Sequence, residues 1–491
     1  MKIKSLLAGM FACAALVACS NNDLVEGDGG NQPLEGDAYV AVAISNPAAS
    51  FGRTASAGDE ENGTDEENKV DGATFVFFDA AGNYITNVAT TLTFNENKQK
   101  SEAVLVLKNA SITPASVVAF LNVPSGLNLN QSLNNLLAST GEYSYGANHT
   151  FAMSNSVLKN GENIQVATPI EAGQIKNNAD EAIDDPVQIY VERVLAKVTV
   201  TDNKLTITST DVTLDGNQAK LTPEIKGWTL SGINKKSYIL KNLTKAIDAD
   251  WVWGNNRSFW AEDMNYTGFA ASQTEDLTFS PYFETKVNPQ YCLENTLTWE
   301  AYQATTVAYT HLLVTAKIKK EDGSYLSTFC NYNGVYWTED NLKTEFVNGL
   351  KDFKKEGDTA ITTDDIEFVQ AGEMGNKAYM AKAVFKDDVK VSDDAKKALA
   401  NKGQFMMYSE GRCYFWTPIE HFGTTGATGS IGVVRNHVYA LNLKSIAGLG
   451  TPIVDPDQPI IPEKPTDDNS YLAAQVNILA WKMVSQDIDL K

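Results

Sequence analysis

Cysteine, histidine and positive charge are scarce in this sequence of 491 residues, which has five Cys, four His and 40 basic residues against 61 acidic ones. The formal net charge of −21 repels phosphate backbones, so a general nucleic-acid-binding role is not expected. The Cys and His residues form no C-x-x-C or H-x-x-x-H pair, which argues against a metal site built from protein ligands. Signatures of nucleotide binding, G-x-S-x-G hydrolases and H-E-x-x-H metalloproteases are also missing. The sequence therefore predicts neither an enzyme nor a bound cofactor.

The apolar run near the N-terminus, residues 5–18, is too short to span a bilayer as a helix and is typical of a signal peptide. It ends in Leu16-Val17-Ala18-Cys19, a lipobox, in which small residues give the signal peptidase access and the Cys19 thiol accepts lipid. An ordinary secretory signal that ends near a Cys is the alternative. We predict that residues 1–18 are a lipoprotein signal peptide and that the precursor is anchored to outer-membrane lipid.

A short strand and a protease-accessible segment follow. Three apolar residues alternate with small ones, which predicts a strand with one buried face: Val40, Val42 and Ile44. After this strand, small residues, Gly and the acidic tract 59–68 make the chain accessible to proteases. Arg53 is the only basic residue between Lys4 and Lys69, so an Arg-specific protease has one obvious place to cut. The acidic tract lacks the spacing of an EF-hand loop and is interpreted as a solvated linker.

From residue 71 onward, short alternating runs separated by turn residues predict an all-β chain of sandwich domains with a few short helices. The run 187–200 is interpreted as one long strand. The domain limits that these runs predict are 54–242 and 243–450. Apolar residues at helical spacing predict an amphipathic helix on the second sheet: Leu342, Phe346, Leu350 and Phe353.

The composition changes twice near the C-terminus. Residues 451–470 hold five of the 15 Pro, which predicts an extended, semi-rigid spacer. Residues 471–491 have the pattern of an apolar strand, which either folds back as a last strand or is offered to another molecule. The side chains expected to form a donor strand are Val476, Ile478, Ala480, Trp481, Met483, Val484, Ile488 and Leu490.

A removable strand at one end and an added strand at the other are the two halves of strand exchange. Cleavage after Arg53 would remove the strand 40–44 as an edge strand and expose apolar residues together with unpaired N–H and C=O groups. The tail of another subunit fills such a groove by strand addition. Because the groove and the tail are different surfaces, the contact is heterologous and produces an open fibre. We therefore expect polymerisation at the cell surface after proteolysis.

Cysteine and tryptophan in the body of the chain allow more than one interpretation. Three buried thiols are expected, with one disulfide and one spare thiol as the alternative: Cys292, Cys330 and Cys413. Five Trp residues are assigned to packing, although in a surface glycan-binding lipoprotein they would stack on sugars: Trp251, Trp253, Trp260, Trp337 and Trp416. The carboxylate pairs Asp364-Asp365 and Asp393-Asp394 lie in polar loops, and nothing orients them as acid and base.

Several motifs together point to one family. They are the lipobox with its acidic tether, Arg53 in its accessible segment, Val191-Glu-Arg-Val-Leu-Ala-Lys-Val198, Gln290-Tyr-Cys-Leu-Glu-Asn-Thr296, Arg435-Asn-His-Val-Tyr439, Gly448-Leu-Gly-Thr-Pro452 and Ile478-Leu-Ala-Trp-Lys-Met-Val-Ser-Gln-Asp-Ile-Asp-Leu490. This set resembles the FimA-like fimbrillins of type V pili in Bacteroidales, and among them the major subunits of the short (Mfa-type) fimbrium.

The resemblance implies two transthyretin-like, Greek-key β-sandwich domains in tandem and a C-terminal donor-strand arm. It implies a lipid (palmitate) on Cys19, a propeptide 19–53, and cleavage by an Arg-specific surface protease between Arg53 and Thr54. Thr54 departs from the Ala that is common in relatives. The family has no catalytic residues, so none are carried over to this chain, and neither a cofactor nor a metal is expected. The implied partners are other copies of the subunit, anchor and tip subunits, and host or bacterial surface receptors.

Two other roles stay open at this point. An anchor would keep its N-terminal strand and lipid, and a tip or accessory subunit need not offer a donor arm. The tail 471–491 and the accessible Arg53 both favour the repeating shaft subunit, or major pilin, of an adhesive cell-surface fimbrium. A surface glycan-binding lipoprotein would not be expected to need either feature.

Overall fold

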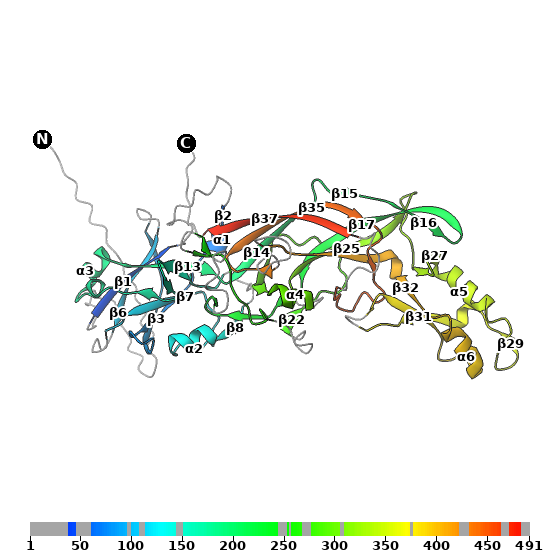
Figure 1. The fold of residues 1–491 in the computed structure, drawn as a ribbon, viewed down its shortest axis with the longest axis horizontal. Coiled ribbons are helices and arrows are strands. Elements are labelled where there is room, and N and C mark those ends of the chain that lie inside the picture. Colours follow the sequence, from blue (N-terminus) through cyan, green and yellow to red (C-terminus); the bar gives the residue numbers. More distant parts are fainter. Residues whose placement is uncertain are drawn as a thin grey trace, which may run out of the picture. The chain divides into compact units, whose positions relative to one another are not determined.

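The computed structural model describes residues 38–45, 60–95, 100–107, 113–143, 151–243, 253–254, 257–267, 276–304, 309–373, 377–421, 432–462 and 471–482. Strands dominate this part of the chain and the helices are short, so the predicted all-β class is confirmed (Figure 1). Within it, no helix has both the length and the apolar character needed to cross a membrane. The chain divides into two units, one of Met1–Val194, Tyr238–Trp260 and Ala480–Lys491 and one of Leu195–Ser237 and Ala261–Leu479.

The first unit contains a sheet with the strand order β4-β3-β7-β9-β13-β1-β6-β5, to which β12 is added beside β7. The elements of this unit are β1 (Ala38–Ser45), β2 (Glu60–Asn62), α1 (Asp65–Asn68), β3 (Ala73–Phe78), β4 (Tyr84–Thr90), β5 (Thr93–Asn95), β6 (Lys100–Leu107), β7 (Ser116–Leu121), α2 (Leu133–Ala138), β8 (Thr140–Glu142), β9 (Met153–Asn155), β10 (Leu158–Asn160), β11 (Asn163–Gln165), β12 (Thr168–Pro169), α3 (Ala179–Asp184), β13 (Val187–Arg193), β20 (Trp253–Gly254) and β21 (Arg257–Ser258). Its core is rich in fully buried aromatic side chains, among them Phe75, Phe77 and Phe120.

The second unit contains more strands and the two longest helices described. Its elements are β14 (Leu195–Thr201), β15 (Thr206–Ile207), β16 (Thr210–Leu214), β17 (Asn217–Ser231), β18 (Ile233–Asn234), β22 (Leu277–Thr278), β23 (Gln290–Leu293), β24 (Asn295–Thr296), α4 (Trp299–Ala304), β25 (His311–Lys320), β26 (Phe329–Tyr332), β27 (Val335–Thr338), α5 (Glu339–Asn348), β28 (Lys354–Lys355), β29 (Thr359–Ala360), β30 (Ile366–Gln370), β31 (Met380–Phe385), α6 (Asp393–Ala400), β32 (Gln404–Tyr408), β33 (Arg412–Pro418), β34 (Gly432–Val433), β35 (His437–Ala447) and β36 (Thr451–Pro452). Strand β37 (Tyr471–Lys482) belongs to this unit up to Leu479.

The predicted single strand 187–200 is wrong, because the chain there forms two strands, β13 and β14, that join different sheets. β14 pairs parallel with β35 and antiparallel with β23, and β17 pairs antiparallel with β25. Residues 195–237 therefore belong with the second unit, and the predicted domain boundary at 242 does not match the observed division. These partners lie far away in sequence, so local patterning could not reveal them.

Two sheets pack against each other in the second unit. One runs β30-β31-β32-β26-β27-β16-β17-β25-β33-β36, and the other contains β37-β35-β14-β23. Alternate residues of β25 (Leu312, Val314) and β35 (Tyr439, Leu441) share one buried cluster, which forms the core between the sheets. At a bulge in β17, a Cβ atom on Gly227 would lie 2.3 Å from the Thr285 carbonyl oxygen, so glycine allows this close approach.

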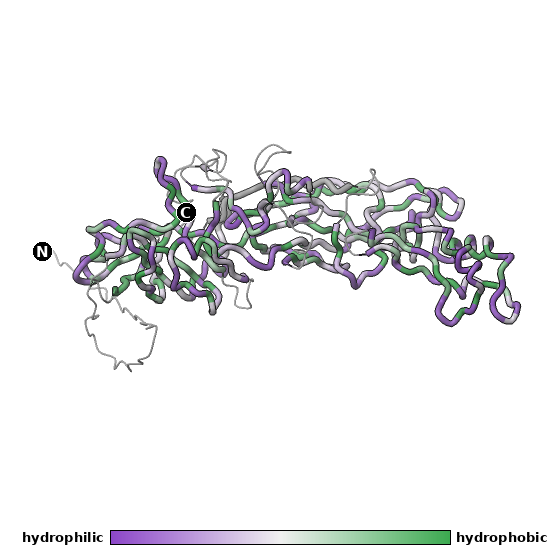
Figure 2. The backbone as a smooth tube through the Cα atoms, turned by 60° about the horizontal axis from the view of Figure 1, so that its bottom comes forward, coloured by the Kyte–Doolittle hydropathy of each residue, from purple (hydrophilic) through white to green (hydrophobic). Residues whose placement is uncertain are grey.

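Helices α5 and α6 cover the β30–β32 end of the larger sheet over a separate core (Figure 1). Leu342 and Phe346 lie in α5 and are buried, as the helical spacing predicted, but the helix ends at Asn348. Leu350 and Phe353 therefore pack on the same core from the following turn. Along the described chain, hydrophobic stretches alternate with hydrophilic ones, and the turns at the α5–α6 end are largely hydrophilic (Figure 2).

Candidate assembly site

Strand β1 is an internal strand of its sheet, bonded to a neighbour on each side. It runs parallel to β13, with Val42 opposite Val187, and antiparallel to β6, with Val40 opposite Leu105. Every residue from Ala38 to Ile44 is at most 8% exposed. The predicted strand 40–44 is confirmed, but its predicted place at the sheet edge is wrong, because β6 supplies the second partner. Loss of β1 would open a gap with two unpaired edges.

The two faces of β1 have different surroundings. Val40, Val42 and Ile44 lie on one face of β1. On the neighbouring strands, Leu105 is opposite Val40 and Ile189 is opposite Ile44, and both are fully buried. On the other face, Tyr39 and Ala41 form an apolar cluster with Ala182 of α3. The backbone of Tyr39 also exchanges two 2.9 Å hydrogen bonds with Lys176. The strand is thus covered on both faces as well as at both edges.

The chain that follows the predicted cleavage segment is fastened to β13. Helix α1 begins with a capping box in which the Thr64 hydroxyl accepts from the Glu67 backbone N–H and the Glu67 carboxylate accepts from that of Thr64. The buried Arg193 of β13 donates through Nε to the Glu67 carbonyl at 3.1 Å and through Nη2 to Asn68 Oδ1. These contacts hold residues 64–68 independently of β1.

Strand β37 is the C-terminal strand that the sequence predicted, and it lies next to β35 in the sheet. At its other end it pairs parallel with β2, with Glu60 opposite Ala480 and Asn62 opposite Lys482. The predicted donor residues Val476, Ile478, Ala480 and Trp481 fall in this strand. Those that lie outside the described residues are Met483, Val484, Ile488 and Leu490, together with Cys19, Arg53 and Thr54.

The first part of the predicted spacer is not a separate extended segment, because residues 451–462 are bound to the second unit. Ile453 and Ile460 are buried in a cluster with Leu313 and Tyr414. The Ile460 N–H donates to the Ser280 carbonyl at 2.8 Å. Thr451 and Pro452 pair with β33 as the short edge strand β36, and the isoleucines beyond them supply the apolar contacts.

A buried ion pair in the first unit joins Lys241 to Glu192 of β13, the strand that borders β1. Lys241 Nζ lies 2.7 Å from Glu192 Oε2, and both side chains are fully buried. The same ammonium group donates to the Ser258 carbonyl at 3.2 Å, and Arg257 Nη2 lies 3.8 Å from the carboxylate. Removing Lys241 would leave the buried Glu192 with the longer contact to Arg257 in place of the close ion pair.

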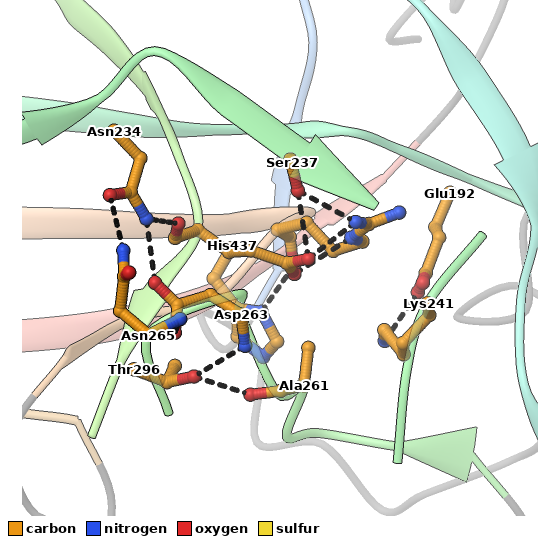
Figure 3. Close-up of polar contacts among 11 residues, drawn as sticks. Glu192, Asn234, Ser237, Lys241, Ala261, Asp263, Asn265, Thr296 and His437 are labelled. Carbon is orange, nitrogen blue, oxygen red and sulfur yellow. Dashed lines mark hydrogen bonds and ion pairs between the residues drawn. The ribbon is translucent and has the colours of Figure 1, made fainter. Parts of the chain in front are cut away.

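A second buried polar cluster lies in the second unit (Figure 3). Arg435 forms a two-pronged interaction with Glu294, through Nε at 2.8 Å and through Nη2, and the Ser237 hydroxyl accepts from Nη2 at 3.0 Å. Asp263 accepts from Asn234 Nδ2 at 2.6 Å and from the Asn265 N–H at 2.9 Å. Burial, with a smaller contribution from the charge of Glu294, raises the pKa of Asp263 to about 8 in spite of these donors.

Several buried charged residues belong to motifs quoted for the resemblance, although the sequence did not predict their burial. Glu192 and Arg193 lie in 191–198, Glu294 in 290–296, and Arg435 in 435–439. The sequence signal that could have indicated this burial is a charged residue within or next to an apolar run. Within the described part of the chain, no group of His, Cys, Asp and Glu side chains is arranged to hold a metal ion.

The structure also decides the alternatives for cysteine and describes most of the tryptophans. Cys292, Cys330 and Cys413 are free and buried, as expected, and burial raises the pKa of Cys292 to about 12. Trp260 is fully buried. The partly buried Trp337 and Trp416 pack against apolar clusters of the second unit, whereas Trp251 lies outside the described residues.

The predicted placement of the paired aspartates in polar loops is wrong, because both pairs lie in helical turns. Asp365 accepts from Lys355 Nζ at 2.7 and 2.8 Å and closes a turn with Thr362, and Asp393 and Asp394 begin helix α6.

Comparison with known proteins identifies one region. Residues 406–487 match the family model described as the C-terminal part of fimbrillin, the major fimbrial subunit protein type IV. A search of curated proteins found no match. Among solved structures, the chain is similar to a fimbrilin (FimA) of Porphyromonas gingivalis, with 17% identity, 92% of this chain and 99% of that chain covered, and a TM-score of 0.41. It is also similar to the tip fimbrial protein Mfa3 of that organism, with 10% identity, coverage of 90% and 99%, and a TM-score of 0.36. Residues 406–487 are thus similar to the C-terminal part of fimbrillins.

Proposed function

We propose that this fimbrillin-like chain is the repeating structural subunit of a cell-surface fimbrium and that it polymerises by strand exchange after proteolysis. The observation that carries the proposal is the placement of β1. This strand fills the interior of a sheet, and it is followed in the sequence by Arg53, the only basic residue between Lys4 and Lys69. One cut after Arg53 would separate an internal strand from the rest of the molecule.

The free energy of such a gap drives its refilling. Burying Val40, Val42 and Ile44 contributes about 1.5–3 kcal/mol each, hence roughly 5–9 kcal/mol for the three together before association costs. The open edges of β6 and β13 would add unpaired N–H and C=O groups, which strongly favour strand addition. A strand offered by another copy restores both ladders at once.

Three further features support the proposal. The contacts of Arg193 with residues 67 and 68 would keep the mature N-terminal segment attached to β13 after β1 has gone. The fimbrillin match extends over β37, the strand available as donor. Because the acceptor gap and the donor strand are different surfaces of the subunit, each exchange leaves one of each free and the fibre stays open-ended. An anchor or tip subunit is the other candidate and would lack one of the two.

The lipid on Cys19, export to the outer membrane and cleavage between Arg53 and Thr54 belong to the same proposal. They supply the order of events: the lipidated precursor is held at the surface with β1 in place until an Arg-specific protease cuts. Assembly with anchor and tip subunits, and adhesion to host or bacterial receptors, would follow from membership in such a fibre.

The test is to treat the purified chain, from Ser20 onward, with an Arg-specific protease and to follow its N-terminus by sequencing and its assembly by electron microscopy. A new N-terminus at Thr54 together with fibres is expected. The variant Arg53→Ala should stay monomeric, and the variant lacking residues 471–491 should be cut without forming fibres. Fibres from either variant would contradict the mechanism. Cleavage of the natural chain without assembly would indicate a tip or accessory subunit, and no cleavage at Arg53 would indicate an anchor or a glycan-binding lipoprotein.

A further inference from the structure

The gap that β1 fills accepts large side chains on one face and an alanine beneath α3 on the other. Val40, Val42 and Ile44 are at most 1% exposed. Ala41, on the opposite face, is 4% exposed and lies in the cluster that contains the fully buried Ala182 of α3. A strand that replaces β1 must therefore have apolar residues at three alternate positions and a small residue at the place of Ala41.

Position 43 has a different character, although Ala43 is itself fully buried. Its neighbours on the two adjacent strands are Glu102 of β6 and Gln188 of β13. A side chain with amide donors and acceptors can hydrogen-bond there between a carboxylate and an amide. The gap thus carries a sequence requirement: apolar, small, apolar, polar or small, apolar, from position 40 to position 44.

Only two registers of the C-terminal sequence 471–491 place an alanine at position 41 and apolar residues at positions 40, 42 and 44. The first begins with Tyr471 at the place of Tyr39. The second begins with Ile478 there, which puts Trp481 at the place of the fully buried Val42 and Lys482 at that of Ala43. An indole in the space of an isopropyl group overpacks the core, so the first register is favoured.

We infer that residues 471–476 of a second copy replace residues 39–44, which makes Ala473 the residue that selects the register. This inference rests on the strand exchange proposed above and goes beyond it. Tyr471 takes the place of Tyr39, Leu472 that of Val40, Ala473 that of Ala41, Ala474 that of Val42, Gln475 that of Ala43 and Val476 that of Ile44. Gln475 then lies between Glu102 and Gln188, where an amide has partners.

A matched pair of variants tests the register, because the two faces of the gap leave room for side chains of different size. Ala473→Leu places a leucine beneath α3 and should lower the yield of fibres at least tenfold. Ala474→Leu adds the same volume on the other face, where β1 has a valine, and should lower the yield by a much smaller factor than Ala473→Leu does. Thermal melting and the rate of cleavage at Arg53 check that both precursors fold. An unchanged yield for Ala473→Leu, or an equal loss for both variants, would overturn the register.

Cross-linking gives a second readout that does not depend on yield. Val40 lies directly opposite Leu105 of β6, so Leu105→Cys combined with Leu472→Cys should form a disulfide between subunits and produce ladders that withstand SDS without reductant. Leu105→Cys with Leu479→Cys is the matched control for the second register and should form none. Ladders from the control alone, or from neither pair in fibres that do assemble, would overturn the inference. Failure of the natural chain to assemble would instead overturn the proposed function.

Discussion

The substitution Ile44→Ala should destabilise the precursor but not the fibre, because residue 44 belongs to the segment that the proposed cut removes. Ile44 is 1% exposed and shares its level with the fully buried Ile189 of β13. Truncating a buried isoleucine to alanine costs about 2–5 kcal/mol. At about 3 kcal/mol, the equilibrium for opening the first unit shifts by roughly a hundredfold, since each 1.4 kcal/mol is a factor of ten.

Hydrogen exchange read by mass spectrometry measures this locally. Peptides from β6 and β13 in the precursor should exchange about a hundredfold faster in Ile44→Ala than in the natural chain when exchange proceeds through opening of this unit. Fibres grown from the cleaved variant should show unchanged protection and unchanged resistance to heat in SDS. The control Ile189→Ala should weaken both forms, because Ile189 stays in the subunit.

One result would refute the reasoning. If fibres of Ile44→Ala lose protection in β6 and β13 to the same extent as the precursor, β1 is still present in the assembled subunit. The gap would then never open, and assembly would have to use another surface.

Three further predictions concern the buried polar groups and one close approach. Lys241→Met should lower the free energy of unfolding of the first unit by about 3–5 kcal/mol in denaturant titrations, because the buried Glu192 loses its 2.7 Å partner and keeps the 3.8 Å contact with Arg257. The double change with Glu192→Gln should recover part of this loss. The raised pKa of Asp263 means that this carboxyl ionises at lower pH in the unfolded chain than in the native one, so the native state loses stability as pH rises from about 4 to about 8. The melting temperature of Asp263→Asn minus that of the natural chain should therefore rise between those pH values and then level off. A difference that does not change with pH would contradict a buried, protonated carboxyl. Gly227→Ala should destabilise the second unit, because its Cβ would lie 2.3 Å from the Thr285 carbonyl oxygen, whereas a melting temperature equal to that of the natural chain would show that the bulge can shift.

Local sequence patterns predicted where strands and helices lie better than they predicted which strands pair with each other. The alternation of Val40, Val42 and Ile44 located β1, and the spacing of Leu342 and Phe346 located α5. The internal place of β1 depends on β6 and β13, of which β13 begins more than a hundred residues later. A strand with one buried face and a strand with two look alike when the second face carries only Ala41 and Ala43.

The candidate site was predictable only in part for the same reason. The sequence located β1 and β37, the two strands that take part in the proposed exchange. It did not reveal that Glu192 and Arg435 are buried. A charged side chain is normally exposed, and its burial depends on an opposite charge that is close in space but distant in sequence. The docking of Ile453 and Ile460 was likewise missed, because the prolines around them indicate an extended backbone but not the surface that it covers.

The bound segment 451–462 also determines how force would travel along a chain of such subunits. Eight residues, 463–470, separate Pro462 from β37, and their fully extended backbone reaches about 30 Å. A pull on a donor strand would therefore tighten after a short extension and load the apolar contacts of Ile453 and Ile460 and their hydrogen bonds to the second unit. The segment 451–462 would bear tension, and the eight residues 463–470 would set how far each connection between subunits extends before that tension rises.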